Sequence, residues 1–300
     1  MALKREDIDQ IMKLLADTSM VPEGGVKYPE EIRAFEKLAH VTKLAMEAEG
    51  MPFHVYQCTP GNMEENAPLF VNVHGGGWYI GHENNDLYFS CWLAEKIKGV
   101  VLSVDYTTSD KAPWEVMFGQ CYEVIKYAFA QAGNLGCSQE KISVGGYSAG
   151  GHLTAGLALR AAEEGYRLKS QIICYAPLDM GKKEEVPAQN PMEERMQLRG
   201  RCFSELLFRR EPEYLTNPLA NPWIAPDEML KKGPRALIIT AGTCGFRFEN
   251  EAYGLRMAAQ GVTVTMKRFC EARHGFIPHF GHCWEAAAEA MVKIIRQPLA

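Results

Sequence analysis

The sequence predicts an α/β protein, with a mostly parallel central sheet that is covered by helices on both faces. Three observations predict this class. Apolar, strand-like runs alternate with helical stretches along most of the chain, which is the pattern of β–α–β units. Several of these runs are apolar throughout, as strands buried on both faces are. The chain has 300 residues, of which 47% are apolar and 23% charged, as expected for one large globular α/β enzyme.

The alternation of strands and helices begins at residue 52. Each expected strand is a short apolar run, and each expected helix is a longer stretch between or after such runs. Strands are expected at residues 52–58, 69–74, 100–106, 141–145, 171–175, 235–241 and 262–269. Helices are expected at residues 87–97, 115–132, 150–164, 249–259 and 284–295.

Two segments lie outside this alternation. Residues 1–50 are expected to form two helices, because apolar residues share a helical face in each half. These faces consist of Ile8, Ile11, Met12 and Leu15, and of Ile32, Phe35, Leu38 and Ala39. Residues 180–232 are charged, contain prolines and separate two strands that should be neighbours in the sheet. We expect a core of residues 51–179 and 233–300, with residues 180–232 inserted over the carboxyl edge of the sheet, where ligands bind in open α/β folds.

The composition argues against several kinds of partner and compartment. A net charge of −5 and a pI near 6.0 give no reason to expect nucleic acid. The polar start and the lack of a run of about 18 apolar residues predict neither a signal peptide nor a membrane span. Nine cysteines without a CxxC motif suggest reduced thiols and a cytoplasmic protein. The oligomeric state stays open, with a homodimer as one option.

The first motif that carries chemistry is GxSxG, formed by Gly146-Tyr147-Ser148-Ala149-Gly150. It follows an expected strand and opens an expected helix, which is the context that a nucleophile elbow requires. The glycines permit a sharp turn in which the serine projects its hydroxyl group. The start of the helix favours the negative charge that develops during attack on a carbonyl. The motif therefore predicts Ser148 as a nucleophile.

The second motif is a glycine-rich loop in the stretch VNVHGGGWYIG, from His74 to Gly81. It matches neither GxxxxGK[ST] nor GxGxxG, so a phosphate-binding loop is not indicated. We interpret it as an oxyanion hole, in which the backbone N–H groups of Gly75, Gly76 and Ala149 point at one carbonyl oxygen. His74 is expected to fix the loop by hydrogen bonding, and not to act as a base.

These two motifs resemble those of the hormone-sensitive-lipase-like esterases of the α/β-hydrolase fold. HGGGW at 74–78 and GYSAGG at 146–151 stand in the order and spacing of that family. The resemblance covers roughly residues 65 to 280 and extends to VDY at 104–106, NPLANPW at 217–223 and ARHGF at 272–276. It implies the α/β-hydrolase fold, with residues 1–50 and 180–232 as a helical cap over an acyl pocket. It also implies hydrolysis of small short-acyl esters without a metal or cofactor.

The resemblance assigns Ser148 as the nucleophile, His274 as the general base, and Gly75, Gly76 and Ala149 as the oxyanion hole. Chemical reasoning agrees on the histidine, because a serine hydroxyl needs a base within hydrogen-bond reach. In this fold the chain order is Ser, acid, His, and His274 follows the last expected strand. His152, one turn beyond the nucleophile, is expected to pack or cap. His279 and His282, with Cys283, miss the usual zinc spacings.

The acid of the expected triad is missing. The family pattern in the loop after the strand 235–241 is roughly Gly-x-Asp-Pro-Leu-Arg-Asp-Glu, and its first aspartate is the catalytic acid. Here the loop begins Gly242-Thr243-Cys244, while Arg247 and Glu249 match the pattern. A free thiol, with a pKa of about 8.5, is mostly uncharged at neutral pH and hydrogen-bonds weakly. The sequence therefore predicts Cys244 at the position of the acid.

Three explanations of this replacement stay open. A substitute acid could reach His274 from elsewhere, with Asp179, just after the strand 171–175, preferred over Glu249 and Glu251. Alternatively, a Ser–His pair works slowly with a water molecule or a backbone partner. As a third explanation, the pocket has become a ligand-binding site without turnover.

Overall fold

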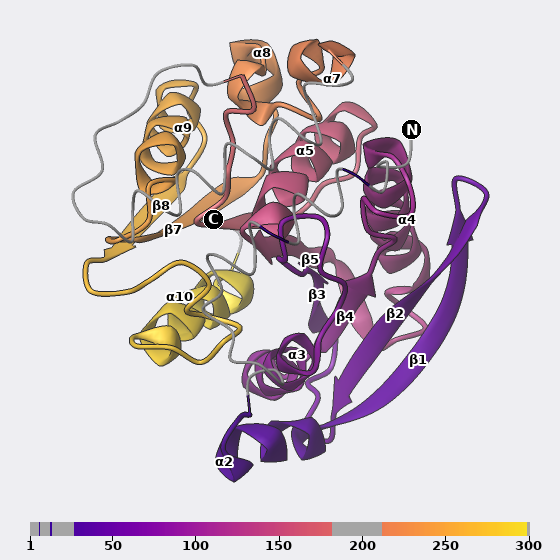
Figure 1. The fold of residues 1–300 in the computed structure, drawn as a ribbon. Coiled ribbons are helices and arrows are strands. Elements are labelled where there is room, and N and C mark those ends of the chain that lie inside the picture. Colours follow the sequence, from indigo (N-terminus) through magenta and orange to yellow (C-terminus); the bar gives the residue numbers. More distant parts are fainter. Residues whose placement is uncertain (1–5, 7–12, 14–26, 182–211, 299–300) are drawn as a thin grey trace.

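The computed structural model describes residues 27–181 and 212–298, together with Glu6 and Lys13. Its centre is one eight-stranded sheet in the order β1-β2-β4-β3-β5-β6-β7-β8 (Figure 1). β2 runs antiparallel to both of its neighbours. The other six strands of the series, β4, β3, β5, β6, β7 and β8 in sheet order, are parallel to one another. The strands are β1 (Ala39–Ala48), β2 (Met51–Pro60), β3 (Ala67–Val73), β4 (Val100–Asp105), β5 (Cys137–Tyr147), β6 (Ser170–Cys174), β7 (Arg235–Ala241) and β8 (Val264–Phe269).

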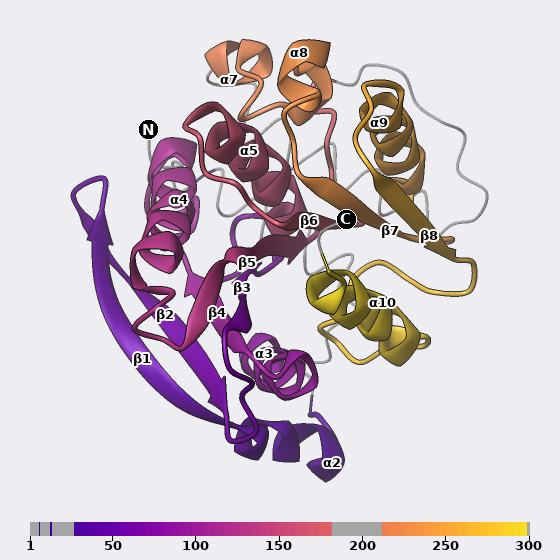
Figure 2. The same ribbon diagram turned by 180° about the vertical axis from the view of Figure 1, so that it is seen from behind.

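Helices cover both faces of this sheet, as Figures 1 and 2 show from opposite sides. α3 and α10 lie on one face, and α4, α5 and α9 lie on the other. The five long helices are α3 (Asn84–Ile97), α4 (Trp114–Gln131), α5 (Ala149–Glu163), α9 (Arg247–Ala259) and α10 (Trp284–Arg296). The expected α/β class is confirmed, as are the seven expected strands and the five helices of the alternation, with small differences at their ends.

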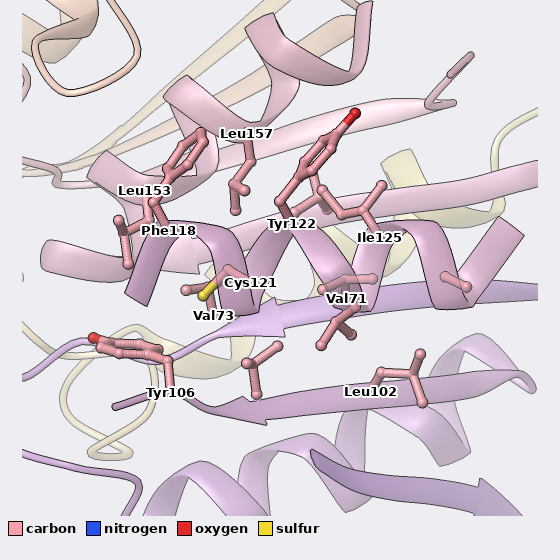
Figure 3. Packing of buried hydrophobic residues seen from close by; sticks show 14 of the residues in the cluster. Val71, Val73, Leu102, Tyr106, Phe118, Cys121, Tyr122, Ile125, Leu153 and Leu157 are labelled. Atoms are coloured by element: carbon pink, nitrogen blue, oxygen red, sulfur yellow. The ribbon is translucent and has the colours of Figure 1, made fainter. Parts of the chain in front are cut away.

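The central strand β3 illustrates why the strand runs are apolar throughout. All seven of its residues are buried, because alternate side chains enter two different cores. Leu69, Val71 and Val73 pack with α4 and α5, and Figure 3 shows part of this cluster, in which Val71 and Val73 of β3 face Phe118, Cys121 and Leu153. Phe70 points to the other face and packs with α3 and α10.

One part of the N-terminal expectation is wrong. The segment around Glu30–Arg33 (α2) and Ala34–Leu38 (η1) is helical, but Ala39–Ala48 forms the edge strand β1 and not the continuation of a cap helix. β1 pairs with β2 along its whole length through a two-residue turn, Glu49-Gly50, in which both residues have positive φ. Alanine, leucine and glutamate are good helix formers, but pairing with β2 along the whole strand outweighs that preference.

The two expected cap segments are only partly described. The first expected N-terminal helix, with its face Ile8 to Leu15, lies outside the described residues, and so does 182–211 of the expected insertion. The described end of the insertion contains α7 (Pro212–Thr216), η2 (Pro222–Ile224) and α8 (Asp227–Leu230). β6 and β7 pair directly although the insertion separates them in the sequence, as expected. The role of these segments as a cap stays a prediction.

The parallel strands bring four loops to one edge of the sheet. The glycine loop follows β3, the elbow serine follows β5, the loop with Cys244 follows β7, and the loop with His274 follows β8. Because these strands are parallel, the loops after their carboxyl ends lie along the same edge. None of the helices in the described part of the chain is long and apolar enough to cross a membrane.

Candidate active site

Ser148 occupies a strained turn between β5 and α5. β5 ends at Tyr147 and α5 begins at Ala149, which leaves Ser148 with φ 52° and ψ −121°. A non-glycine residue in such a conformation costs of order 1–3 kcal/mol, so the surroundings must hold it in place. The Ser148 N–H donates to the carbonyl of Cys174 at 2.9 Å, and the Ser148 carbonyl accepts from the His152 N–H at 3.0 Å. The turn is the nucleophile elbow that the sequence predicts.

Gly150 explains why the elbow lies against the glycine loop. A Cβ atom at this position would come within 2.1 Å of the Val73 carbonyl oxygen and 2.3 Å of the His74 carbonyl oxygen. The start of α5 therefore packs directly on the backbone at the end of β3, with no room for a side chain. This close approach places Ser148 beside the loop that begins at His74.

His274 contacts the serine from the loop after β8. Its Nε2 lies 2.8 Å from Ser148 Oγ. The rings of Tyr175 and Phe246 flank the imidazole edge-on, with centroids 5.1 and 5.6 Å away. These two residues come from the ends of different strands, so the orientation of the imidazole is fixed by packing. The structure therefore brings together the serine and histidine that the sequence pairs.

Cys244 lies on the other side of the same imidazole. Its Sγ is 3.2 Å from His274 Nδ1, and its side chain is fully buried. Arg247 supports the loop, since its Nη1 donates to the Gly242 carbonyl at 2.8 Å and reaches the Cys244 carbonyl at 3.4 Å. Ser148, His274 and Cys244 thus form a continuous chain of polar contacts.

Asp179, the expected substitute acid, is not the group that the structure places at Nδ1. The Nδ1 atom that an acid would approach faces the Cys244 sulfur. Asp179 Oδ1 accepts the Gly181 N–H at 3.1 Å, in a turn of its own loop. The chain before it is held by α9, because the Leu178 N–H donates to Glu249 Oε1 at 2.8 Å. The other two carboxylates considered, Glu249 and Glu251, belong to α9, as expected.

Asp179→Asn is therefore expected to leave ester hydrolysis almost unchanged. Asparagine keeps the oxygen that accepts the Gly181 N–H, and only the negative charge is lost. We expect kcat to change by less than tenfold, whereas loss of the charge of a triad acid lowers it by about 10⁴-fold. Steady-state kinetics of the variant measure this difference, and a loss of the larger size would restore Asp179 as the acid.

The glycine loop is curled against the elbow. A Cβ atom at Gly75 would lie 3.0 Å from the Tyr147 carbonyl oxygen and 3.5 Å from Ser148 Cβ. Gly76 has φ +101°, which L side chains rarely adopt, and its carbonyl accepts the Ile80 N–H at 2.9 Å. Within the described part of the chain, the N–H groups of Gly75, Gly76 and Ala149 have no hydrogen-bond acceptor. These are the three donors that the sequence assigns to an oxyanion hole.

His74 is buried under this loop and supports it. Its Nδ1–H donates to the Gly75 carbonyl at 2.7 Å, and its ring stacks on Tyr106 at 4.1 Å with an interplanar angle of 3°. The Tyr106 hydroxyl donates to the His74 carbonyl at 3.1 Å. Burial lowers the pKa of His74 to about 4, so the ring is neutral at pH 7. These contacts agree with the expected structural role.

A second support, which the sequence did not reveal, links three separate segments. Trp78 Nε1–H donates to His152 Nδ1 at 3.3 Å, and His152 Nε2–H donates to the Ala220 carbonyl at 2.8 Å. Burial lowers the pKa of His152 to about 4 and keeps it neutral. The glycine loop, the elbow helix and the NPLANPW segment are therefore joined through one histidine. The NPLANPW match at 217–223 marks this segment in the sequence, but the match by itself does not indicate a contact with His152.

The histidines near the C-terminus have other partners. The Tyr28 hydroxyl lies 2.9 Å from His279 Nδ1, and His282 Nε2 lies 3.1 Å from Glu271 Oε2. Among the described residues, no group of three or more His, Cys, Asp or Glu side chains could hold a metal ion.

Strand order, elbow and glycine loop together define an α/β hydrolase. A family model of the alpha/beta hydrolase fold matches residues 70–278, and the chain belongs to this family, whose hormone-sensitive-lipase-like branch the motifs indicate. It is 28% identical over 245 residues to an arylesterase of Saccharolobus solfataricus, covering 78% of this chain and 76% of that protein. It is 26% identical over 303 residues to a carboxylesterase of Mycobacterium tuberculosis, covering 95% and 93%.

Solved structures agree with the fold. A hyperthermophilic esterase from the archaeon Pyrobaculum calidifontis superposes with a TM-score of 0.77 at 25% identity, covering 99% of this chain and 98% of that one. A monoclinic form of the esterase from the same organism gives a TM-score of 0.81 at 23% identity, covering 97% and 92%. The α/β-hydrolase fold that the motifs imply is thus confirmed.

Proposed function

We propose that the protein is a carboxylesterase that forms an acyl-enzyme on Ser148. The observation that carries the proposal is the 2.8 Å contact between Ser148 Oγ and His274 Nε2, made by a serine on a strained elbow. A serine becomes a useful nucleophile only with such a base. The relatives named arylesterase and carboxylesterase support ester hydrolysis as the reaction.

Acylation starts with attack of Ser148 Oγ on the ester carbonyl carbon. As the Oγ–C bond forms, the hydroxyl proton passes to His274 Nε2 and the carbonyl oxygen becomes an oxyanion. The N–H groups of Gly75, Gly76 and Ala149 donate to this oxyanion, and such donors act most strongly on charge that develops in the transition state. The C–O bond to the alcohol then breaks, and the Nε2 proton goes to the departing oxygen.

Deacylation repeats these steps with water. His274 Nε2 takes a proton from the water molecule, whose oxygen attacks the acyl carbon. The bond to Ser148 Oγ then breaks, the proton returns to Oγ, and a carboxylic acid leaves. His274 must carry its other proton on Nδ1 throughout, so the Cys244 sulfur, 3.2 Å away, is the group that orients it. No metal or cofactor takes part in these steps.

The proposed substrates are small esters with short acyl chains. This follows from the resemblance to capped esterases, with residues 1–50 and 180–232 as the source of a cap. A panel of p-nitrophenyl esters, from acetate to long-chain acyl groups, tests the preference directly. We expect kcat/KM to be highest for acyl chains of roughly two to six carbons, because a compact pocket excludes longer ones.

The proposed nucleophile is tested by Ser148→Ala in the same panel. We expect hydrolysis to fall by several orders of magnitude, since the variant cannot form an acyl-enzyme. A fluorophosphonate probe should label the wild type at Ser148, as located by mass spectrometry of the labelled peptide, and should leave the variant unlabelled. Unchanged hydrolysis by Ser148→Ala, or labelling of a different serine, would remove Ser148 from this role.

The second candidate function is ligand binding without turnover, and the sulfur at the position of the acid favours it. A neutral thiol neither holds the ring proton on Nδ1 as a carboxylate does nor stabilises the imidazolium. This function predicts binding of one ester molecule per chain by calorimetry, with no alcohol released and no labelling by the probe. Turnover that depends on Ser148 would exclude it.

A further inference from the structure

Both ring nitrogens of His274 have polar partners, so the location of one proton decides what the ring can do. Nε2 lies 2.8 Å from Ser148 Oγ, and Nδ1 lies 3.2 Å from Cys244 Sγ. A neutral imidazole carries a single N–H, on one nitrogen or on the other. A carboxylate can only accept from this ring, whereas a thiol can donate as well.

We propose that the proton of the Cys244 thiol controls the tautomer of His274, so that loss of this proton activates Ser148. The inference rests on the proposed function, in which His274 Nε2 is the base. It assigns Cys244 as a positioning residue that acts through His274, and it makes the esterase an enzyme controlled by alkaline pH.

The thiol can donate or accept a hydrogen bond, and the thiolate can only accept. When the thiol donates its S–H to Nδ1, the ring proton must be on Nε2, where it faces Ser148 and blocks proton transfer. When the sulfur is a thiolate, it can only accept, which places the proton on Nδ1 and leaves the Nε2 lone pair facing Ser148. The thiolate also stabilises the imidazolium that forms during attack, as the aspartate of an ordinary triad does.

The charged and titratable groups around the sulfur come from several elements. From α9, the Arg247 guanidinium donates to the backbone carbonyls of Gly242 and Cys244, and its positive charge favours a thiolate. Glu251, also on α9, interacts with Arg247 and weakens this effect. From the end of β6, Tyr175 lies close by, and burial together with the neighbouring thiols raises its pKa, so it stays neutral.

Burial acts in the opposite direction to Arg247. The Cys244 side chain is fully buried within the apolar cluster that includes Phe276 and Ile277, and an apolar environment disfavours a charged thiolate. Asp86 of α3 also faces Tyr175, and burial raises its pKa to about 7. Since burial disfavours the thiolate, we expect the sulfur to ionise only at alkaline pH, and to titrate together with His274 as a pair.

The protons balance through one cycle. The neutral pair first loses one proton to solvent: the thiol proton moves to Nδ1 and the ring proton on Nε2 is released, which leaves a thiolate and a neutral ring with its proton on Nδ1. The Ser148 proton then moves to Nε2, and the pair becomes a thiolate facing an imidazolium. When Nε2 protonates the leaving alcohol, the same thiolate and neutral ring are regenerated, so the sulfur is neither oxidised nor bonded to substrate.

The test compares wild type, Cys244→Asp and Cys244→Ser across acid and alkaline pH. Two rates are measured, kcat/KM for a p-nitrophenyl ester and the rate of Ser148 labelling by a fluorophosphonate, each corrected with Ser148→Ala. We expect the wild-type rates to rise at alkaline pH, with a midpoint above that of Cys244→Asp. The aspartate variant should reach its plateau at lower pH than the wild type, because its carboxylate is already charged there. At pH 7 it should be faster than wild type by roughly one or two orders of magnitude.

The serine variant isolates the effect of ionisation from that of size. Its hydroxyl group does not ionise in this range, so its rates should stay low and show no alkaline rise. A wild-type midpoint equal to that of Cys244→Asp, or an alkaline rise retained in Cys244→Ser, would overturn the inference. The fluorophosphonate arm needs no knowledge of the true substrate.

A further measurement separates this inference from the proposed function. If neither ester nor probe reacts with Ser148 at any pH, the proposed function fails. The ultraviolet absorbance of thiolate, taken as wild type minus Cys244→Ser, then still reports the ionisation of Cys244. The inferred coupling predicts that His274→Ala displaces this titration. If the titration of Cys244 is the same in His274→Ala as in the wild type, the ionisation of the sulfur does not depend on His274.

Discussion

His274→Ala is expected to lower kcat for ester hydrolysis by about 10⁴–10⁶-fold, the range that loss of a catalytic histidine gives in serine hydrolases. The substitution removes the base that lies 2.8 Å from Ser148 Oγ and takes its proton. The oxyanion donors remain, so residual hydrolysis above the uncatalysed rate should persist. KM should change little, because His274 acts on the serine and not on the bound ester. Steady-state kinetics with a short-acyl p-nitrophenyl ester measure both constants.

His282→Ala is the matched control for this variant. His282 lies in the same C-terminal region but is exposed and contacts only the exposed Glu271 among the partners that the structure gives it. We expect its kcat to equal that of the wild type. A comparable loss of kcat in both variants would mean that substitutions in this region disturb the structure. The fall in kcat of His274→Ala would then not report the loss of proton transfer. A loss confined to KM in His274→Ala would contradict the role of base.

Gly76→Val is expected to lower kcat by about 10²–10³-fold, the usual effect of losing one oxyanion donor. Gly76 has φ +101°, and a Cβ atom there would lie 2.6 Å from the Ile80 carbonyl oxygen and 2.8 Å from Ile80 Cβ. The loop must therefore change its backbone conformation, and its N–H groups move away from the oxyanion. Because the oxyanion exists only in the transition state and the tetrahedral intermediate, the loss should appear in kcat more than in KM.

Gly61→Val is the control for this substitution. Gly61 lies in the turn between β2 and β3, where a Cβ atom would have no neighbour within 4 Å. Both variants add the same side chain, so a difference in kcat between them is due to the altered glycine loop and not to the valine itself. Thermal unfolding should accompany the kinetics, because a large fall in Tm for Gly76→Val would point to a damaged core. An intact kcat with a raised KM would mean that the loop only binds the substrate.

Local sequence signals predicted most of the framework correctly. Buried strands such as β3 are apolar at every position, and the helices that cover them have their own periodicity, so neither depends on distant contacts to be recognised. β1 is the exception. None of its residues is fully buried and several are good helix formers, and only its pairing with β2 makes it a strand.

The candidate site was predictable where a motif fixes the backbone. GxSxG between a strand and a helix determines the elbow, and HGGGW after a strand determines the loop. In both motifs the backbone packs too closely, or turns too sharply, for a residue with a side chain, so glycine is needed at a fixed position. The ARHGF match, together with the chain order and the position after the last expected strand, selected His274. Tertiary structure decided the rest: sulfur and not the carboxylate of Asp179 faces His274 Nδ1, and His152 joins Trp78 to Ala220. These contacts join loops from different strands, and their geometry depends on how each loop turns after leaving the sheet, which no local pattern encodes.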